Sequence, residues 1–212
     1  MSFDTYSIAR LSELDRDNLA SFDCLDESEF RGSQRRTRRR LENHSLDMNY
    51  FLVNEALDEQ DEGYNTTYLL KDENSNILAY ISLCADAIRL NYNERNQGAI
   101  GYEMFPSLKI ARLAVHKDHQ KQGIGKYLIH FAISKALVMR ETVGGVKFLT
   151  LDCFLHRLRF YTSDKVGFVE NQIQANQGEN HRPISLRLHI DEYLERLNTY
   201  EEEDINDNEE AI

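Results

Sequence analysis

A strand-like segment that leads through a glycine-containing turn into an amphipathic helix constrains this chain more than any other part of its sequence. Residues Ile110 to Val115 form an apolar run, a polar turn follows, and a helical pattern starts at Gly125. The first turn of a helix has backbone N–H groups without intrahelical partners and carries partial positive charge. Glycine lets an anion approach these amides, because no Cβ stands in the way. The segment therefore predicts an anion-binding site.

The spacing of the glycines excludes two common nucleotide-binding loops. In the nucleotide P-loop the Gly-Lys pair is followed by Ser or Thr, whereas Lys126 is followed by Tyr127. The dinucleotide fingerprint needs a third glycine, but Leu128 stands three residues after Gly125. What remains is a strand followed by the pattern Gln120-x-x-Gly123-x-Gly125.

This pattern resembles motif A of the GNAT acetyltransferase superfamily, which holds the pyrophosphate of acetyl-CoA. The resemblance implies acetyl-CoA as co-substrate and no metal. It also implies that a backbone amide of the fourth strand, at Ala114 or Val115 here, stabilises the thioester carbonyl. The implied acetyl-CoA contacts are Leu113, Ala114, Val115, Gln120, Lys121, Gln122, Gly123, Ile124, Gly125 and Lys126.

A second segment, Arg159 to Phe168, resembles the superfamily's aromatic–tyrosine and Gly-Phe signature after the fifth strand. The resemblance gives Tyr161 the role of protonating the departing CoA thiolate. A phenol, with a pKa of about 10, suits a thiol whose pKa is about 8.5. The alternative is that Tyr161 is an ordinary aromatic on the inner face of a helix. Phe154 replaces a common asparagine and Arg157 a common alanine, so the local CoA contacts differ from those of the family.

The base that accepts the amine proton is less defined. Glu103 resembles the superfamily's glutamate base in its general position, and it is the residue we assign. His116 and His119 are alternatives, because an unperturbed histidine has a pKa of about 6.5. Each of the three also fits a solvated loop residue. Arg112 either orients an anionic acceptor group or is a structural ion-pair partner.

The order of the apolar segments predicts an α/β fold, a mixed sheet built around a β-loop-α-β unit. Under the resemblance this is the GNAT-like twisted central sheet flanked by helices, with acetyl-CoA at the junction of the fourth strand and the following helix. We expect a polar, mobile loop over Asn91–Gly98. The expected strands are Phe3–Leu11, Tyr64–Lys71, Ile77–Ile88, Leu108–Val115, Val146–Cys153, Phe168–Ile173 and Ile184–Ile190. The expected helices lie within Asp15–Phe22, Ser33–Leu57, Gly125–Arg140, Leu155–Val166 and Asp191–Leu197.

The 212 residues suit one domain, which we expect over residues 1–200, with an arginine-rich helical insertion at about 27–57. Residues 201–212 contain seven acidic side chains and no basic ones, and account for most of the net charge of −11. We expect this tail to be disordered, because it repels itself and has little to bury.

The sequence predicts a cytoplasmic protein with no membrane association. No apolar run approaches the roughly 18 residues of a membrane span, and no signal-peptide pattern is visible. Cys24, Cys84 and Cys153 have no metal-ligand spacing and are expected to be free thiols, acting as small buried hydrophobic residues.

The leading hypothesis is an acetyl-CoA-dependent N-acetyltransferase in which a primary amine of a small molecule, peptide or protein attacks the thioester directly.

An alternative comes from four segments, whose order is similar to that in GNAT toxins of toxin–antitoxin modules: Ser21–Cys24, Tyr50–Leu52, Thr67–Leu70 and Ala79–Leu83. Those enzymes acetylate aminoacyl-tRNA, which implies tRNA as a partner through the six arginines of Arg31–Arg40. The toxins are typically shorter and basic, unlike this chain, and Glu27, Glu29 and Glu42 could neutralise the arginines. A non-catalytic acyl-CoA-binding module is a third alternative, and a homodimer stays open because dimers are common in the family.

Overall fold

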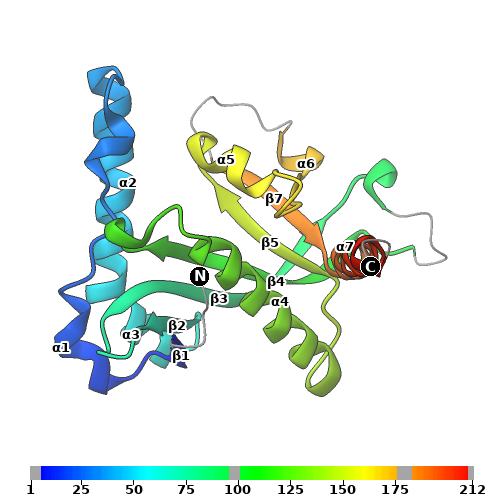
Figure 1. Cartoon of the computed structure of the whole chain (residues 1–212), viewed down its shortest axis with the longest axis horizontal. Helices are drawn as coiled ribbons and strands as arrows, with labels where there is room; N and C mark the ends of the chain where they lie inside the picture. The colour runs from blue at the N-terminus through cyan, green and yellow to red at the C-terminus, as the bar shows by residue number, and fades with distance from the viewer. Residues whose placement is uncertain (1–5, 96–100, 176–182, 210–212) are drawn as a thin grey trace. The chain divides into compact units, whose positions relative to one another are not determined.

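The computed structural model describes residues 6–95, 101–175 and 183–209 (Figure 1), and the chain divides into two units. Unit 1 comprises Met1–Cys84 and Ile110–Phe131, and unit 2 comprises Ala85–Lys109 and Ala132–Ile212. Within these described residues, seven strands are hydrogen-bonded in the order β1-β2-β3-β4-β5-β7-β6. The long strands β3 (Ile77–Arg89) and β4 (Met104–Val115) contribute residues to both units. The predicted α/β fold, a mixed sheet with flanking helices, is confirmed.

The strands of unit 1 pair through a turn whose sequence explains its shape. Strands β1 (Ser7–Arg10), β2 (Thr66–Lys71) and β3 are antiparallel neighbours, and Leu69 lies opposite Tyr80. In the turn between β2 and β3, Asp72 Oδ1 accepts the N–H groups of Asn74 and Asn76 at 2.9 and 2.8 Å. An aspartate that binds its own backbone in this way stabilises a tight turn.

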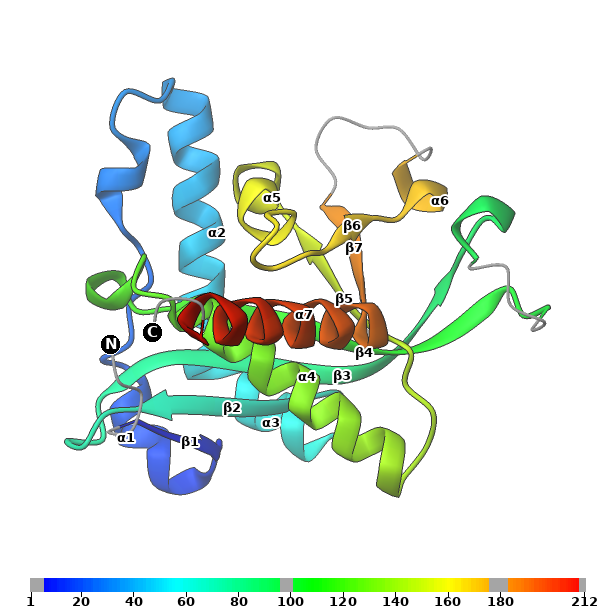
Figure 2. The ribbon, with the colours of Figure 1, turned by 45° about the vertical axis from the view of Figure 1, so that its right-hand side comes forward.

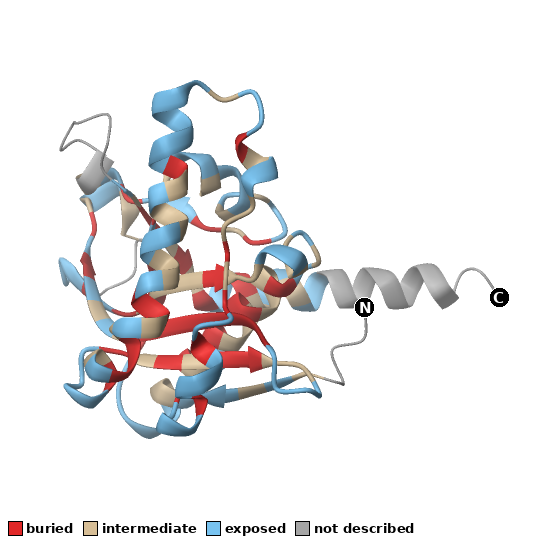
Figure 3. Ribbon diagram, turned by 90° about the vertical axis from the view of Figure 1, so that its left-hand side faces the viewer, coloured by how far each residue is buried: buried red, intermediate tan, exposed pale blue. Residues whose placement is uncertain are grey.

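The predicted helical region Ser33–Leu57 forms two helices, α2 (Arg35–Asn54) and α3 (Ala56–Asp61). Phe51 and Leu52 near the end of α2 are buried in one core with Leu69, Tyr80 and Ala114. The first half of α2 extends beyond the strands of unit 1 (Figure 1) and is largely exposed (Figure 3). The remaining helices of this unit are η1 (Glu13–Asp15), α1 (Arg16–Leu19), η2 (Glu27–Phe30), η4 (Lys117–His119) and the start of α4 (Ile124–Thr142).

Unit 2 is organised around strand β7 (Ile184–His189), which is antiparallel to both β5 (Phe148–Cys153) and β6 (Val169–Glu170). All residues of β5 except Asp152 are buried, as its near-continuous apolar sequence predicts. The helices of this unit are η3 (Tyr92–Glu94), the rest of α4, α5 (Leu155–Tyr161), α6 (Gln172–Ala175) and α7 (Ile190–Glu209).

Three predicted elements of unit 2 differ from the structure. The helix predicted to reach Val166 ends at Tyr161, because the hydroxyls of Thr162 and Ser163 hydrogen-bond the carbonyls of Leu158 and Phe160. The strand predicted over Phe168–Ile173 is limited to the two residues of β6, and α6 follows. The expected mobile loop Asn91–Gly98 contains η3, while its residues 96–98 lie outside the described part of the chain.

The last helix also reaches further than the sequence pattern indicates. Helix α7 follows β7 directly and continues to Glu209, so it takes in residues 201–209 of the acidic tail (Figure 2). Residues 210–212 lie outside the described residues. No helix within the described ranges is both long enough and apolar enough to cross a bilayer.

Candidate active site

The turn between β4 and α4 presents backbone N–H groups at the start of a long helix. The first helical bond runs from the Tyr127 N–H to the Gly123 carbonyl, at 3.0 Å. The N–H groups of Ile124, Gly125 and Lys126 therefore have no hydrogen-bond acceptor within the helix. The predicted anion site requires such groups. Gly123 has a φ of +86° and Lys121 a φ of +60°, so two left-handed residues shape the turn.

Gln120 holds this turn in place through its side-chain amide. Its Nε2 donates to the carbonyl of Val115 at 3.1 Å and to that of Cys24 at 2.9 Å. The Oε1 atom is buried and has no hydrogen-bond partner among the described residues. In this structure, the motif's glutamine joins the end of β4 to the segment that precedes α2.

Asp23 anchors the same turn from the other side, which the sequence did not indicate. Its carboxylate contacts Lys117 Nζ at 2.9 Å and accepts from Asn49 of α2 at 2.8 Å and from the Leu25 N–H at 2.9 Å. Partial burial opposes its charge, but these three hydrogen bonds hold the pKa of Asp23 below its usual value. Asp23 is therefore ionised at neutral pH and links α2 to the residues after β4.

The two lysines of the turn differ in their surroundings. Lys121 is exposed and its Nζ lies 3.7 Å from Asp26 and 3.9 Å from Glu29. Lys126 is half-buried and forms no ion pair within the described residues. Lys126 is therefore the better placed of the two to add positive charge to an anion at the helix start.

His116 is oriented as a hydrogen-bond donor rather than as a base. Burial lowers the pKa of His116, so the ring is neutral at pH 7. Its Nδ1 accepts the Asp118 N–H at 3.3 Å, which places the single ring proton on Nε2. His119 lies beside it, with ring centroids 5.9 Å apart.

Arg112 stacks on α2 instead of entering an ion pair with any described residue. Its guanidinium carbon lies 4.9 Å from the centre of the Phe51 ring, a cation–π contact. Its Nη1 donates to the Ala111 carbonyl at 3.4 Å. The ion-pair alternative for Arg112 is therefore not observed in the described chain.

Tyr161 is the last residue of α5 in unit 2. Its ring packs edge-on against Phe160 and Phe168, with centroids 4.9 and 5.8 Å away, and its carbonyl accepts the Phe168 N–H at 3.0 Å. Burial, assisted by Cys153, raises the pKa of Tyr161 to about 12. The phenol therefore keeps its proton at every physiological pH, which is the form that a proton donor needs.

Two of the three cysteines, Cys24 and Cys153, are buried as predicted. Cys84 is half-buried instead, and none of the three forms a disulfide within the described residues. Burial raises the pKa of the Cys153 thiol to about 11, so it remains protonated and unreactive at neutral pH.

Glu103 lies immediately before β4 and is held by two arginines. Its carboxylate oxygens are 2.6 Å from Arg89 and 3.8 Å from Arg95, and its side chain is 54% exposed. Its carbonyl accepts the Leu90 N–H at 3.2 Å. Its position is thus fixed by unit 2 itself.

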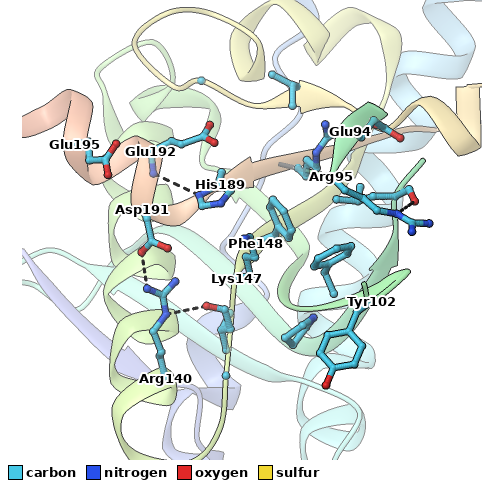
Figure 4. Close-up of a pocket in the computed structure, with 18 of the residues that line it drawn as sticks. Glu94, Arg95, Tyr102, Arg140, Lys147, Phe148, His189, Asp191, Glu192 and Glu195 are labelled. Atoms are coloured by element: carbon cyan, nitrogen blue, oxygen red, sulfur yellow. Dashed lines mark hydrogen bonds and ion pairs between the residues drawn. The ribbon is translucent and has the colours of Figure 1, made fainter. Parts of the chain in front are cut away.

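Unit 2 also contains a cavity of about 960 Å³ that the sequence did not indicate (Figure 4). Its lining includes Phe105 and Phe148, whose rings pack edge to face with centroids 6.0 Å apart. Several of its charges are paired with each other: Arg140 contacts Asp191 at 2.5 Å, and Arg187 contacts Glu94 at 2.8 Å. The Glu94 and Arg187 side chains are only 2% and 13% exposed, so this ion pair is buried.

The arginine cluster forms an exposed surface at the start of α2. Arg38 pairs with Glu42 at 2.6 Å and lies 3.9 Å from Glu27. Glu29 faces Lys121 instead. The other arginines are exposed and form no ion pair within the part of the chain that the structure describes: Arg31, Arg35, Arg36, Arg39 and Arg40. The predicted neutralisation by nearby glutamates is therefore confined to one arginine of six.

The described residues contain no group of three or more His, Cys, Asp or Glu side chains that could hold a metal ion.

Comparison with known proteins places this geometry in a family. The fold is similar to that of the toxin AtaT complexed with acetyl-methionyl-tRNAfMet, with a TM-score of 0.66 and 19% identity over 91% of this chain and 98% of that chain. It is similar to a tyrosine-to-phenylalanine mutant of KacT, with a TM-score of 0.67 and 18% identity over 92% and 99% of the two chains. AtaTR bound with AcCoA matches with a TM-score of 0.59 and 21% identity over 89% and 96%. The family model described as "Acetyltransferase (GNAT) domain" matches residues 64–170, half of the chain. The chain belongs to the GNAT family of acetyltransferases.

Proposed function

We propose that this acetyltransferase transfers the acetyl group of acetyl-CoA to the primary amino group of an aminoacyl-tRNA. The observation that carries the proposal is the exposed surface of unpaired arginines on α2, in an enzyme whose family acts by acetyl transfer. The similarity of the fold to AtaT, which is known complexed with acetyl-methionyl-tRNAfMet, supports it.

The donor binds at the turn between β4 and α4. The unpartnered N–H groups of Ile124, Gly125 and Lys126 meet the pyrophosphate of acetyl-CoA, and Lys126 adds positive charge. Leu113, Ala114 and Val115 of β4 contact the thioester end of acetyl-CoA, and a main-chain amide of Ala114 or Val115 donates to the thioester carbonyl. Gln120 and Asp23 act by positioning the turn.

The transfer is a direct attack. The neutral amine forms a C–N bond with the thioester carbonyl carbon, and the carbonyl oxygen becomes an oxyanion. When the oxyanion collapses, the C–S bond breaks and the electron pair leaves with sulfur. Tyr161 donates its phenolic proton to that sulfur. The amine loses one proton to Glu103, directly or through a water molecule. The products are an N-acetylated amine and CoA thiol.

A polyanionic acceptor explains the α2 surface better than a small amine does. Five exposed arginines within ten residues repel each other, and of the six arginines in this cluster only Arg38 pairs with a glutamate among the described residues. Nucleic-acid phosphates neutralise such clusters and release counterions, which favours binding. A small amine or neutral peptide has no use for a surface of this kind.

Incubating the purified protein with acetyl-CoA and aminoacyl-tRNA tests the proposal. We expect acetyl label in the RNA fraction, on the aminoacyl group, with one CoA thiol released for each acetyl group transferred. Deacylated tRNA should give neither. Turnover with small amines or peptides but none with any aminoacyl-tRNA would leave an N-acetyltransferase and remove tRNA as its acceptor.

Replacing Arg36, Arg39 and Arg40 together by glutamine should raise the KM for aminoacyl-tRNA and leave the KM for acetyl-CoA unchanged. Each lost phosphate contact should lower the slope of log K against log salt by about one. Arg16→Gln is the matched control, because Arg16 is an exposed arginine of the same unit that pairs with Glu13 at 2.8 Å. Equal effects of the triple variant and the control would contradict a specific α2 contact.

Gly123→Ala should raise the KM for acetyl-CoA about five- to thirtyfold. A Cβ at Gly123 meets no atom within 4 Å, so the effect comes from the φ of +86°. An L-residue there costs about 1–2 kcal/mol, and each 1.4 kcal/mol is a factor of ten in binding. Gly63→Ala is the control, since Gly63 has a similar φ of +79°, a Cβ there meets no atom within 4 Å, and Gly63 lies outside this turn. An unchanged KM in Gly123→Ala, measured by steady-state kinetics, would show that this turn does not hold the donor.

A further inference from the structure

We infer that Tyr50, together with Leu46, forms a stacking platform for an unpaired base of the tRNA acceptor end. The inference rests on the proposed function and deepens it, because it assigns a position to the 3′ end of the acceptor. The side chains of Leu46 and Tyr50 are 51% and 59% exposed. They lie four residues apart on α2 and are therefore neighbours on its surface.

Tyr50 and Leu46 share one face of α2 with the arginines. At 100° per residue, this face comprises residues 36, 39, 40, 43, 46, 47, 50 and 54, all of them exposed. The opposite side carries Leu41 and Leu52, which are buried. The face thus presents arginines in the first turns of α2, and the pair Leu46 and Tyr50 towards its end.

The exposure of Tyr50 has no explanation within unit 1. Its ring and hydroxyl contact no hydrogen-bonding, ionic or aromatic partner among the described residues. Its backbone belongs to α2, and its carbonyl also accepts from Asn54 Nδ2 at 3.0 Å. Tyr80 shows the contrast: its ring is buried and its hydroxyl donates to the Met48 carbonyl at 2.8 Å. An exposed aromatic ring in line with unpaired arginines matches the way proteins bind single-stranded nucleic acid, through stacked bases and contacted phosphates.

The end of the α2 face that bears Tyr50 lies nearer to the turn between β4 and α4 than the end that bears the arginines. Asn49, next to Tyr50, is bonded to Asp23 and the Cys24 N–H, and these residues are bonded in turn to Lys117 and Gln120. Phe51 shares a core with Ala114 of β4. The end of α2 that bears Tyr50 is therefore the end linked to the turn between β4 and α4. Arg36 lies about 21 Å away from Tyr50 along the helix axis.

This polarity fits an acceptor stem laid along α2. The arginines contact phosphates of the paired stem, and the unpaired 3′ nucleotides that carry the aminoacyl group pass over Tyr50 towards β4. Two exposed apolar side chains on a convex helix face offer no groove for a partner helix, which favours nucleic acid over a protein occupant. Asp47 lies on the same face, and its negative charge repels phosphate. Asp47→Asn should therefore increase the affinity for tRNA.

The test measures the KM for aminoacyl-tRNA in Tyr50→Ala, Tyr50→Phe and Tyr64→Ala. Tyr50→Ala should raise the KM about tenfold, the range for loss of one base–aromatic stack, and should leave the salt slope unchanged. Tyr50→Phe keeps the ring and should stay within about twofold of wild type. Tyr64 is a 71% exposed tyrosine of the same unit outside this face, so Tyr64→Ala should match wild type.

A second measurement uses uncharged tRNA with and without its unpaired 3′ nucleotides. The affinity of wild type should be lower for the shortened RNA than for the whole RNA. For the shortened RNA, the affinities of wild type and Tyr50→Ala should be equal. If wild type acetylates aminoacyl-tRNA but Tyr50→Ala has the same KM, the platform is wrong and the proposed function stands. If Tyr50→Ala instead changes the oligomeric state and leaves tRNA affinity intact, the face is a contact between copies of the chain. No acetylation of any aminoacyl-tRNA by wild type overturns the proposed function, and this inference with it.

Discussion

Tyr161→Phe is expected to lower kcat about 10²- to 10⁴-fold while the KM for acetyl-CoA changes little. General acid catalysis contributes on this scale, and its loss affects the transition state rather than the ground state. The substitution removes only the hydroxyl, so the edge-on packing of the ring against Phe160 and Phe168 is retained. Steady-state release of CoA thiol at saturating acetyl-CoA is the measurement.

The pKa of Tyr161 adds a second expectation. Because burial raises this pKa to about 12, the phenol is protonated below that pH and loses its proton only above it. Any fall in rate between about pH 6 and pH 10 must therefore come from another group, such as the amine or its base. Tyr64→Phe is the control, because Tyr64 is a 71% exposed tyrosine with no assigned role in the reaction. If Tyr161→Phe keeps kcat within twofold of wild type, Tyr161 is not the proton donor.

Arg187→Met is expected to lower the free energy of unfolding by about 3–5 kcal/mol, because it leaves the buried carboxylate of Glu94 without its counter-charge. Arg187 Nη1 also donates to the Glu170 carbonyl at 3.0 Å and to Asn171 Oδ1 at 2.9 Å. Glu94 in turn accepts the Gln172 N–H at 3.0 Å. One ion pair thus joins η3, β6, β7 and the start of α6. Chemical denaturation of wild type and variant measures the loss.

Two further variants separate the charge from the shape of the side chain. Arg187→Met combined with Glu94→Gln should recover part of the loss, since no unpaired charge remains. Arg89→Met breaks the ion pair between Arg89 and Glu103, whose side chains are 61% and 54% exposed. This variant should lower the free energy of unfolding by only about 0–1 kcal/mol. A loss below about 1 kcal/mol in Arg187→Met would show that the buried pair does not hold these elements together.

The sequence predicted the local structure of the turn between β4 and α4 well, because the determinants of that structure are local. Apolar periodicity and two glycines placed the helix start at Gly125, and the structure starts α4 at Ile124. The left-handed backbone at Gly123 agrees with the role expected of a glycine there. The hairpin turn Asp72–Asn76 was predictable for the same reason, since Asp72 binds its own backbone.

The contacts that hold the turn could not be predicted, because they join residues far apart in the sequence. Asp23 and Lys117 are 94 residues apart, and Glu94 and Arg187 are 93 apart. Glu94 lies in an asparagine-rich segment with the composition of a solvated loop, yet its side chain is 2% exposed. Charged side chains of this kind are buried only when paired, and local sequence does not reveal the partner.

The arginine cluster shows a third limit. Composition revealed six arginines and three glutamates near them, but only the fold could decide which of them pair. Helix α2 brings Glu42 to Arg38 at i,i+4, and the turn brings Lys121 to Glu29, so the remaining arginines are left exposed and unpaired within the described chain. The sequence therefore indicated the cluster as a possible tRNA contact, and the structure added which of its arginines are exposed and unpaired.

The most direct test of this account is the acceptor itself. Wild-type protein, acetyl-CoA and aminoacyl-tRNA should together yield N-acetylated aminoacyl-tRNA with stoichiometric release of CoA thiol, and the yield should fall with the Arg36, Arg39 and Arg40 triple variant. Growth of cells that express the intact protein should stop, and expression of Tyr161→Phe should not stop it. Release of CoA thiol with small amines or peptides, but no label in any aminoacyl-tRNA, would contradict the account.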